Sequence, residues 1–138
     1  MVPVFKEYGL DKVRWGTHTR MDEADARAFD MAESGCVYIG FGAESASAHT
    51  LKNMKKGGFI LKNEMSDINI NGKNYEFPNT MMNAIKTCKD ANIHPNCTWI
   101  MGYPGESLQH LQTSVAFILW QEDFWSSGID KSTPAYEI

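Results

Sequence analysis

The feature that most constrains this chain is an apolar run at residues 36–42, CVYIGFG, which has no polar face. A strand at the surface of a sheet alternates polar and apolar residues, whereas a strand covered by helices on both sides does not. The run therefore predicts the central strand of a parallel sheet. Val13, Trp15 and Thr17 alternate upstream and predict a half-buried strand, and residues 97–101 predict a third strand.

Segments with helical spacing separate and follow these strands. Each begins near a side chain that can accept the free N–H groups of a first helical turn. The predicted helices, with their starts, are 23–33 after Asp22, 47–54 at Ser47, 79–91 at Asn79 or Thr80, and a last helix opening at Glu106 and Ser107.

The last helix and the segment at residues 59–78 differ in polarity. Leu108, Leu111, Val115 and Ile118 recur at intervals of three or four, which predicts the apolar face by which the last helix packs. Residues 59–78 are polar and rich in turn formers, which predicts either a small hairpin or an excursion over the active face.

The alternation of strands and helices predicts an α/β fold made of parallel βα units with right-handed crossovers. Either a doubly wound sheet or part of a βα barrel satisfies this pattern. A complete barrel takes on the order of 250 residues, and this chain has 138. We expect an incomplete barrel over residues 1–125, followed by a polar tail, or the start of missing sequence, at 126–138.

Composition argues against several kinds of partner. The formal net charge is -4, with 13 basic and 17 acidic residues, so nucleic acid is not expected to bind. The longest apolar stretch, residues 114–120, is far shorter than the roughly 20 residues of a membrane span, and no export signal is evident at the start. Three cysteines without C-x-x-C spacing suggest a reducing cytoplasm.

Polar and glycine residues gather where the predicted strands end, which is where parallel βα folds place their ligands. The first strand is followed by Arg20, and its His18 is placed for substrate contact. The second delivers Glu44 and Ser45. The third is followed by Gly102, Pro104, Gly105 and Glu106, a strand-to-helix turn. The four histidines have no metal-ligand spacing, so no metal site is predicted.

These residues belong to a series of short blocks that resembles the middle of the radical S-adenosylmethionine superfamily, in the branch that often carries a cobalamin-binding domain. The resemblance begins at Trp15, and each block alone would be weak evidence. The blocks are RMD at 20–22, MAESGC at 31–36, IGFGAES at 39–45, LKNMKKG at 51–57, the helix at 84–93, and IMGYPGES at 100–107.

The resemblance implies a partial βα barrel in which S-adenosylmethionine lies across the strand ends and chelates a [4Fe-4S] cluster. In the family a C-x-x-x-C-x-x-C loop holds that cluster, and this sequence has no such loop. The matching blocks correspond to the third to fifth barrel strands. We therefore expect a truncated reading frame or a fragment, inactive by itself, whose missing partner is the N-terminal half of the barrel.

The resemblance also suggests roles for individual residues. Glu44 and Ser45 match a position that binds the ribose hydroxyls or the methionine amino group. Ile100 and Gly102 match a segment that packs on adenine. The remaining candidates are Arg20 and Lys56 for the methionine carboxylate, and Pro104 and Gly105 in the turn, which could equally serve only to start the helix.

Two other functions are compatible with the residues. The chain could be a non-catalytic or degenerate module that binds S-adenosylmethionine or another nucleotide without any cluster. It could also be an unrelated βα-barrel hydrolase that uses Glu44 and Glu106 as acid and base. The substrate and the reaction product are not specified by the sequence under any of these interpretations.

Overall fold

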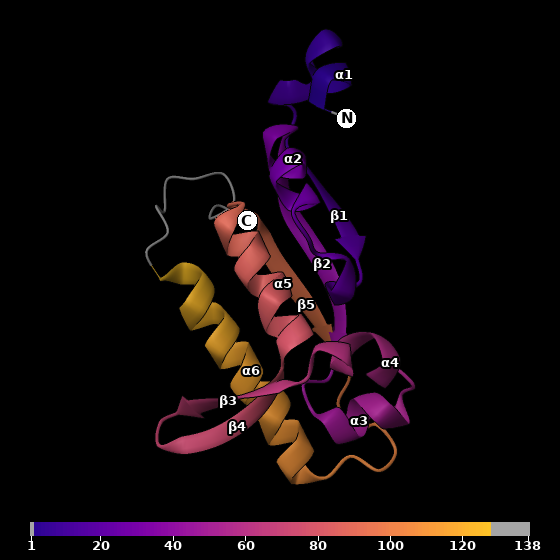
Figure 1. Ribbon diagram of the computed structural model, residues 1–138, viewed down its shortest axis with the longest axis vertical. Helices are drawn as coiled ribbons and strands as arrows, with labels where there is room; N and C mark the ends of the chain where they lie inside the picture. Colours follow the sequence, from indigo (N-terminus) through magenta and orange to yellow (C-terminus); the bar gives the residue numbers. More distant parts are fainter. Residues whose placement is uncertain (1, 128–138) are drawn as a thin grey trace.

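The computed structural model describes residues 2–127 and contains two sheets with helices between the strands (Figure 1). The elements in chain order are α1 (Val2–Glu7), η1 (Leu10–Lys12), β1 (Trp15–Thr19), η2 (Met21–Glu23), α2 (Arg27–Glu33), β2 (Cys36–Glu44), α3 (Ala48–Asn53), α4 (Gly57–Ile60), η3 (Leu61–Asn63), β3 (Met65–Ile70), β4 (Lys73–Pro78), α5 (Asn79–Asp90), β5 (His94–Trp99) and α6 (Leu108–Ser126), where η denotes a 3₁₀ helix.

The main sheet has the strand order β1-β2-β5, and both pairings are parallel. The prediction that the apolar run at 36–42 is a central parallel strand is thus confirmed. The third strand begins and ends earlier than the sequence pattern indicated, at His94 and Trp99. All three strands end on the same edge of the sheet, because they are parallel.

Helices α2, α5 and α6 pack on one side of this sheet (Figure 1). Ile39, Phe41 and Ala43 of β2 are at most 2% exposed and belong to one core cluster with residues of α2, α5 and α6. Phe117 of α6 is fully buried and its ring lies 5.8 Å from that of Trp99. Alternate residues of the strands point to opposite faces, so the other face of the sheet lies away from this core.

Residues 65–78 of the polar segment at 59–78 form a hairpin, which was one of the two alternatives predicted from the sequence, and residues 59–63 lie in α4 and η3. Strands β3 and β4 pair antiparallel from Met65↔Pro78 to Ile70↔Lys73. Asn71 and Gly72 both have positive φ, 52° and 84°, which is the backbone form of the tight turns that join such strands. The hairpin joins the core through Phe77, whose buried ring meets Phe117 edge-on at 5.1 Å.

Two of the expected helix caps are used differently. Asp22 pairs with Arg20, and α2 begins only at Arg27. Asn79 is the first residue of α5, and its side chain bonds Ser66 and the carbonyl of Asn63. Asp22 is therefore engaged by a neighbour two residues before it, whereas Asn79 is engaged by residues 13 and 16 positions away in the sequence. Ser47 does cap α3, by accepting from Thr50 N–H.

The buried face of α6 is not the one that the apolar spacing predicted. Leu108 and Val115 are 71% and 43% exposed, whereas Ser114 and Gln121 are buried. These polar side chains face inward because they bond backbone groups at the sheet: Ser114 Oγ accepts from Ala46 N–H, and Gln121 Nε2 donates to Pro95 O. Buried polar groups are tolerated when they are bonded in this way.

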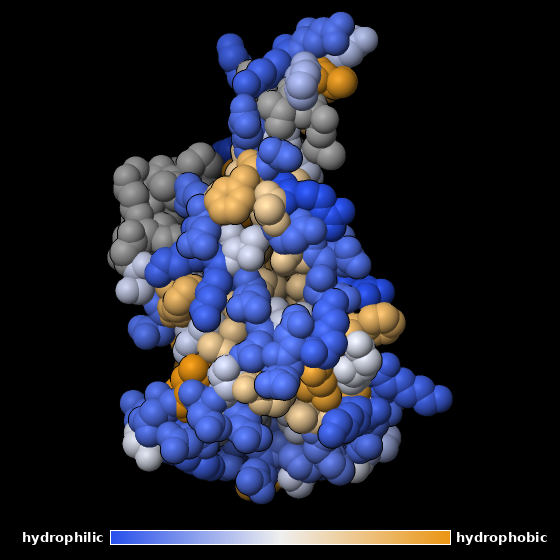
Figure 2. All heavy atoms as spheres, in the orientation of Figure 1, coloured by the Kyte–Doolittle hydropathy of each residue, from blue (hydrophilic) through white to orange (hydrophobic). Residues whose placement is uncertain are grey.

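The surface seen in Figure 2 is largely hydrophilic, with separate hydrophobic patches. Among residues 2–127, every helix falls short of the length and apolarity needed to cross a bilayer. Of the predicted polar tail at 126–138, Ser126 ends α6 and Ser127 follows it, and the rest lies outside the described residues.

Phe117 joins α6, the hairpin and the sheet, so its loss should destabilise the fold. We expect Phe117→Ala to lower the free energy of unfolding by about 3–5 kcal/mol, because it leaves a cavity among three rings. Phe29, which is 50% exposed on α2, offers the matched control. Urea titration should place Phe29→Ala within about 0.5 kcal/mol of wild type; equal losses for the two variants would contradict this packing.

Candidate functional site

The carboxyl edge of the main sheet gathers most of the residues that the sequence suggested. Arg20 follows β1 directly, Glu44 is the last residue of β2, and Ile100 follows β5. Lys56 lies immediately before α4, which is connected to β2 through α3. The structure brings Glu44, Lys56 and Ile100 into direct contact, whereas Arg20 and Ser45 have other partners.

Glu44 is the centre of this arrangement. Its φ is 65°, a left-handed conformation that is unusual for a residue with a side chain, and the register of β2 against β5 shifts between Gly42 and Glu44. Its carbonyl accepts a hydrogen bond from Ile100 N–H at 2.9 Å. Unfavourable backbone conformations of this kind tend to occur where function requires them.

The side chains of Glu44 and Lys56 form an ion pair. Lys56 Nζ lies 3.2 Å from Glu44 Oε1 and donates a second hydrogen bond, of 2.9 Å, to the carbonyl of Gly42. The two side chains are 22% and 34% exposed, so the pair is partly buried and still reachable. A carboxylate beside an ammonium can bind the two opposite charges of an amino-acid group.

The face of the sheet that lies away from the helices continues this polar site. Tyr38 of β2 and Asn96 of β5 meet across it, with Asn96 Nδ2 donating to Tyr38 Oη at 2.8 Å. His18 of β1 contacts Tyr38 edge-on, with ring centroids 5.9 Å apart. The face therefore carries hydrogen-bonding side chains from all three strands.

Glycines on β2 leave the space that these groups occupy. A Cβ at Gly40 would lie 2.3 Å from a ring carbon of His18, and a Cβ at Gly42 would lie 3.0 Å from Glu44 Oε1. Sequence reasoning identified His18 and missed Tyr38 and Asn96. The signal was present in the alternation of Tyr38, Gly40 and Gly42, which places small residues on one side of the central strand.

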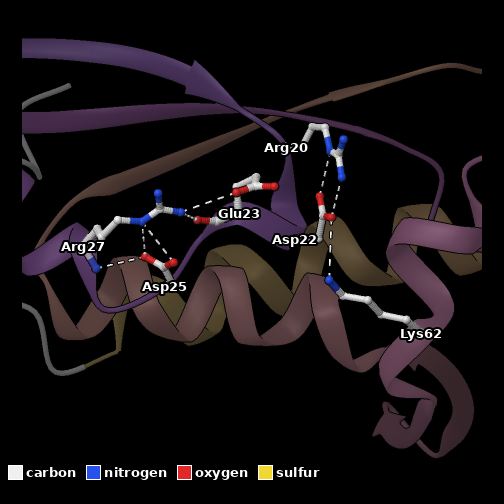
Figure 3. A network of polar contacts seen from close by, with 6 residues as sticks. All are labelled: Arg20, Asp22, Glu23, Asp25, Arg27 and Lys62. Carbon is white, nitrogen blue, oxygen red and sulfur yellow. Dashed lines mark hydrogen bonds and ion pairs between the residues drawn. The ribbon is translucent and has the colours of Figure 1, made fainter.

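Arg20 is held by a neighbour (Figure 3). Its Nε and Nη2 atoms donate to the two carboxylate oxygens of Asp22 at 2.9 and 2.6 Å, and its guanidinium lies 3.9 Å from the ring centroid of Phe59. Lys62 approaches the same carboxylate at 3.7 Å. The hydrogen bonds from Arg20 hold the pKa of Asp22 below its usual value. Arg20 thus fastens η2 to the α4 region.

Ser45 is fully buried, which is at odds with its suggested contact with a cofactor. Its hydroxyl lies 3.2 Å from that of Ser114 and accepts from Ser47 N–H. The residue therefore connects the end of β2 to α6 and to the start of α3. Sequence spacing could not distinguish it from Glu44, because the turn after a strand sends neighbouring side chains in different directions.

The segment between β5 and α6 is held in shape by a hydrogen bond between two of its own residues. Ile100 is 42% exposed, and Gly102 has a φ of 74°. Glu106 Oε2 accepts from Gly102 N–H at 2.7 Å, so this carboxylate is engaged in shaping the turn. Pro104 is exposed, and Gly105, with a φ of 85°, lies against Asn53. This use of Glu106 weakens the hydrolase interpretation, which needs that carboxylate for catalysis.

The three cysteines lie on separate elements, Cys36 on β2, Cys88 on α5 and Cys97 on β5. Burial raises the pKa of Cys88 and of Cys97 to about 12, and it also raises the pKa of Cys36. Cluster ligands are thiolates, so these thiols are poorly suited to hold an iron–sulfur cluster.

Asp22 gives a pH-dependent prediction. Asp22→Asn should lower the free energy of unfolding at pH 7, because the side chain is only 4% exposed and loses its bidentate partner. Its folded-state pKa is depressed, so the wild-type advantage is complete above the ordinary carboxyl pKa of about 4 and disappears as the pH falls through the lowered value.

Urea unfolding at pH 7 and at pH 2.5 measures this effect. Asp25→Asn is the matched control, because the Asp25–Arg27 pair has similar geometry and both side chains are more than half exposed. An Asp22→Asn loss that is the same at both pH values would contradict the assignment.

Comparisons with known proteins found a similar sequence and a similar solved structure. No protein-family model matches the chain. An uncharacterized methyltransferase of Pyrococcus horikoshii is 27% identical over 113 residues, which is 81% of this chain and 20% of that protein. The radical S-adenosylmethionine methyltransferase TsrM from Kitasatospora setae matches 88% of this chain with a TM-score of 0.64 and 16% identity.

TsrM has been solved with cobalamin and a [4Fe-4S] cluster, and also with its tryptophan substrate and an S-adenosylmethionine analogue. This chain covers 21% of TsrM. It therefore spans about a fifth of the length of the methyltransferase from Pyrococcus horikoshii and of TsrM. Its α/β fold, with a parallel sheet, is similar to part of a radical S-adenosylmethionine methyltransferase.

Proposed function

We propose that this chain is a segment of a radical S-adenosylmethionine enzyme, in which β1, β2 and β5 form part of a βα barrel and residues 1–125 are barrel sequence. Its task is to position S-adenosylmethionine. An iron–sulfur cluster, when bound, supplies the electron for reductive cleavage of that molecule to a deoxyadenosyl radical. The cluster ligands belong to residues outside this chain, because its own cysteines lie on three separate elements.

The observation that carries this proposal is the Glu44–Lys56 pair at the end of the central strand. The methionine part of S-adenosylmethionine carries an ammonium and a carboxylate. Glu44 Oε1 accepts from the ammonium, and Lys56 Nζ, which is 3.2 Å from that oxygen, donates to the carboxylate. The ligand's two charges thus bind beside an existing ion pair, so neither protein charge is left without a partner.

The adenine ring is assigned to the segment after β5. Ile100 offers a half-exposed apolar side chain, and a Cβ at Gly102 would meet no atom within 4 Å. Glu44 O and Ile100 N–H are hydrogen-bonded at 2.9 Å, so the two ends of the ligand would bind to segments that already touch. Pro104 and Gly105 give the turn its shape, and their part is to support Ile100 and Gly102.

The polar face with His18, Tyr38 and Asn96 is assigned to the substrate. His18 lies over Gly40, and the Glu44–Lys56 pair lies over Gly42, two residues farther along β2 on the same face. We extend the proposal to a cobalamin-dependent methyl transfer by the longer protein, on the strength of the two methyltransferases that the chain resembles. The proposed setting is cytoplasmic, without nucleic acid or membrane, and with the rest of the barrel as partner.

A non-catalytic S-adenosylmethionine-binding module is the second candidate. The observation in its favour is that the proposed ligand contacts all lie within this chain, whereas its thiols are unsuited to a cluster. Both candidates predict binding of S-adenosylmethionine. They differ in whether attaching the remaining barrel and its cluster adds cleavage to that binding.

Binding by the chain alone tests the assignment of Glu44. Isothermal titration with S-adenosylmethionine should show that Glu44→Gln weakens affinity about tenfold, which is about 1.4 kcal/mol. Glu64→Gln is the matched control, because Glu64 also has a positive φ, 64°, and lies on an exposed loop. Its affinity should equal that of wild type.

Adenosine, which lacks the methionine part, separates the two roles suggested for Glu44. If Glu44 binds the ammonium, Glu44→Gln should leave adenosine binding unchanged. If Glu44→Gln weakens the affinity for both ligands equally, Glu44 binds the ribose hydroxyls instead of the ammonium. If wild type binds neither ligand, or if Glu44→Gln binds S-adenosylmethionine as tightly as wild type, the proposal fails.

A further inference from the structure

The outer face of α6 carries an apolar stripe that nothing in residues 2–127 covers. Leu108, Val115 and Leu119 are 71%, 43% and 57% exposed. At 100° per residue these side chains, together with the partly exposed Leu111, fall on one side of the helix. That side is opposite Phe117, which faces the core.

The sequence of α6 is unusual for a helix with one side in water. Residues 108–121 contain no Asp, Glu, Lys or Arg. A surface helix carries charges on its outer face, whereas a helix that is apolar all round is covered on all sides. This stretch of α6 is not apolar all round, since Gln109 and Gln112 are exposed, but its lack of charge favours a partner over the apolar stripe.

The stripe continues into a groove of about 400 Å³ between α6 and the hairpin. The hairpin supplies Ile70 and Tyr75 to its wall, and α6 supplies Leu111, Val115 and Leu119. Contiguous apolar surface of this kind marks sites where another protein surface packs. Lys73, at the start of β4, lies along the same groove, with its Nζ 5.2 Å from the Tyr75 ring centroid.

We propose that a second copy of this chain covers the stripe, with the two α6 helices antiparallel about a two-fold axis at Val115. In that arrangement Val115 meets Val115 of the partner subunit. Residues at equal distances from the axis pair with each other, so Leu111 meets the partner's Leu119, and the same contact repeats on the other side. An interface around a two-fold axis requires a self-complementary surface, and this spacing satisfies that requirement.

Charge also favours a second copy in this orientation. Glu122 is the first acidic residue after the uncharged stretch, and it lies on the same side of α6 as the stripe. Leu108 lies seven residues before Val115 in the sequence, and Glu122 lies seven residues after it. The antiparallel pair therefore places Glu122 of the partner subunit next to Leu108, at the end of the groove that Lys73 lines. Lys73 can then attract Glu122 of the partner subunit, and the two-fold axis repeats this attraction at the other end of the interface.

A cysteine at the axis tests the arrangement directly. Val115→Cys places two thiols together across the two-fold axis, so mild oxidation should link the chains at least tenfold faster than in Lys86→Cys, an exposed control on α5. The native Cys36 and Cys88 are buried, which limits their competition. Equal rates for the two variants overturn the proposal.

Sedimentation equilibrium supplies a second measurement. Wild type should reach twice the monomer mass of 15.6 kDa as concentration rises, and Val115→Lys should stay monomeric with an unchanged circular dichroism spectrum. Glu122→Lys should weaken association, and adding Lys73→Glu should restore it. A wild type that is monomeric throughout, or that forms a series of larger species, would falsify the dimer and leave the stripe to another part of a longer protein.

Discussion

The hydrogen bonding of β2 on both of its edges is the constraint on which the rest of the structure depends. Because β1 and β5 both pair with it in parallel, all three strands end together and their following segments meet at one edge. Ile39, Phe41 and Ala43 pack against the helices on one face. On the other face Gly40 and Gly42 have no side chains and leave room for neighbouring polar groups. The division between a packed side and a polar side originates in this strand.

Much of the fold was predictable because local rules and tertiary packing agree there. The apolar run required a central strand, Ser47 capped α3, and the Asn71–Gly72 turn gave the hairpin. The helix starts that were predicted wrongly involve side chains that bond another group instead of the helix N-terminus: Asn79 bonds Ser66 and Asn63, far away in the sequence. Asp22 pairs with Arg20, two residues before it, and also lies 3.7 Å from Lys62, which is 40 positions away and could not be inferred from local spacing.

The site was predictable to the level of the edge and not to the level of each side chain. The position of Glu44 after a strand and the family resemblance pointed to Glu44, Lys56 and Ile100, and Glu44 contacts both of the others. Tyr38 and Asn96 were missed because they lie 58 positions apart and meet only once β2 and β5 are in register. Ser45 was included because a position next to Glu44 looks equivalent until the direction of its side chain is known.

The hydrogen bond from Ile100 to Glu44 has a consequence for how such a site can change. It joins the last residue of β2 to the first residue after β5, so a shift of one segment displaces the other. A substitution that retunes one segment would therefore alter the second as well. Substitutions that change ligand specificity at this edge would therefore affect both segments together, whereas side chains on the open face of the sheet can change one at a time.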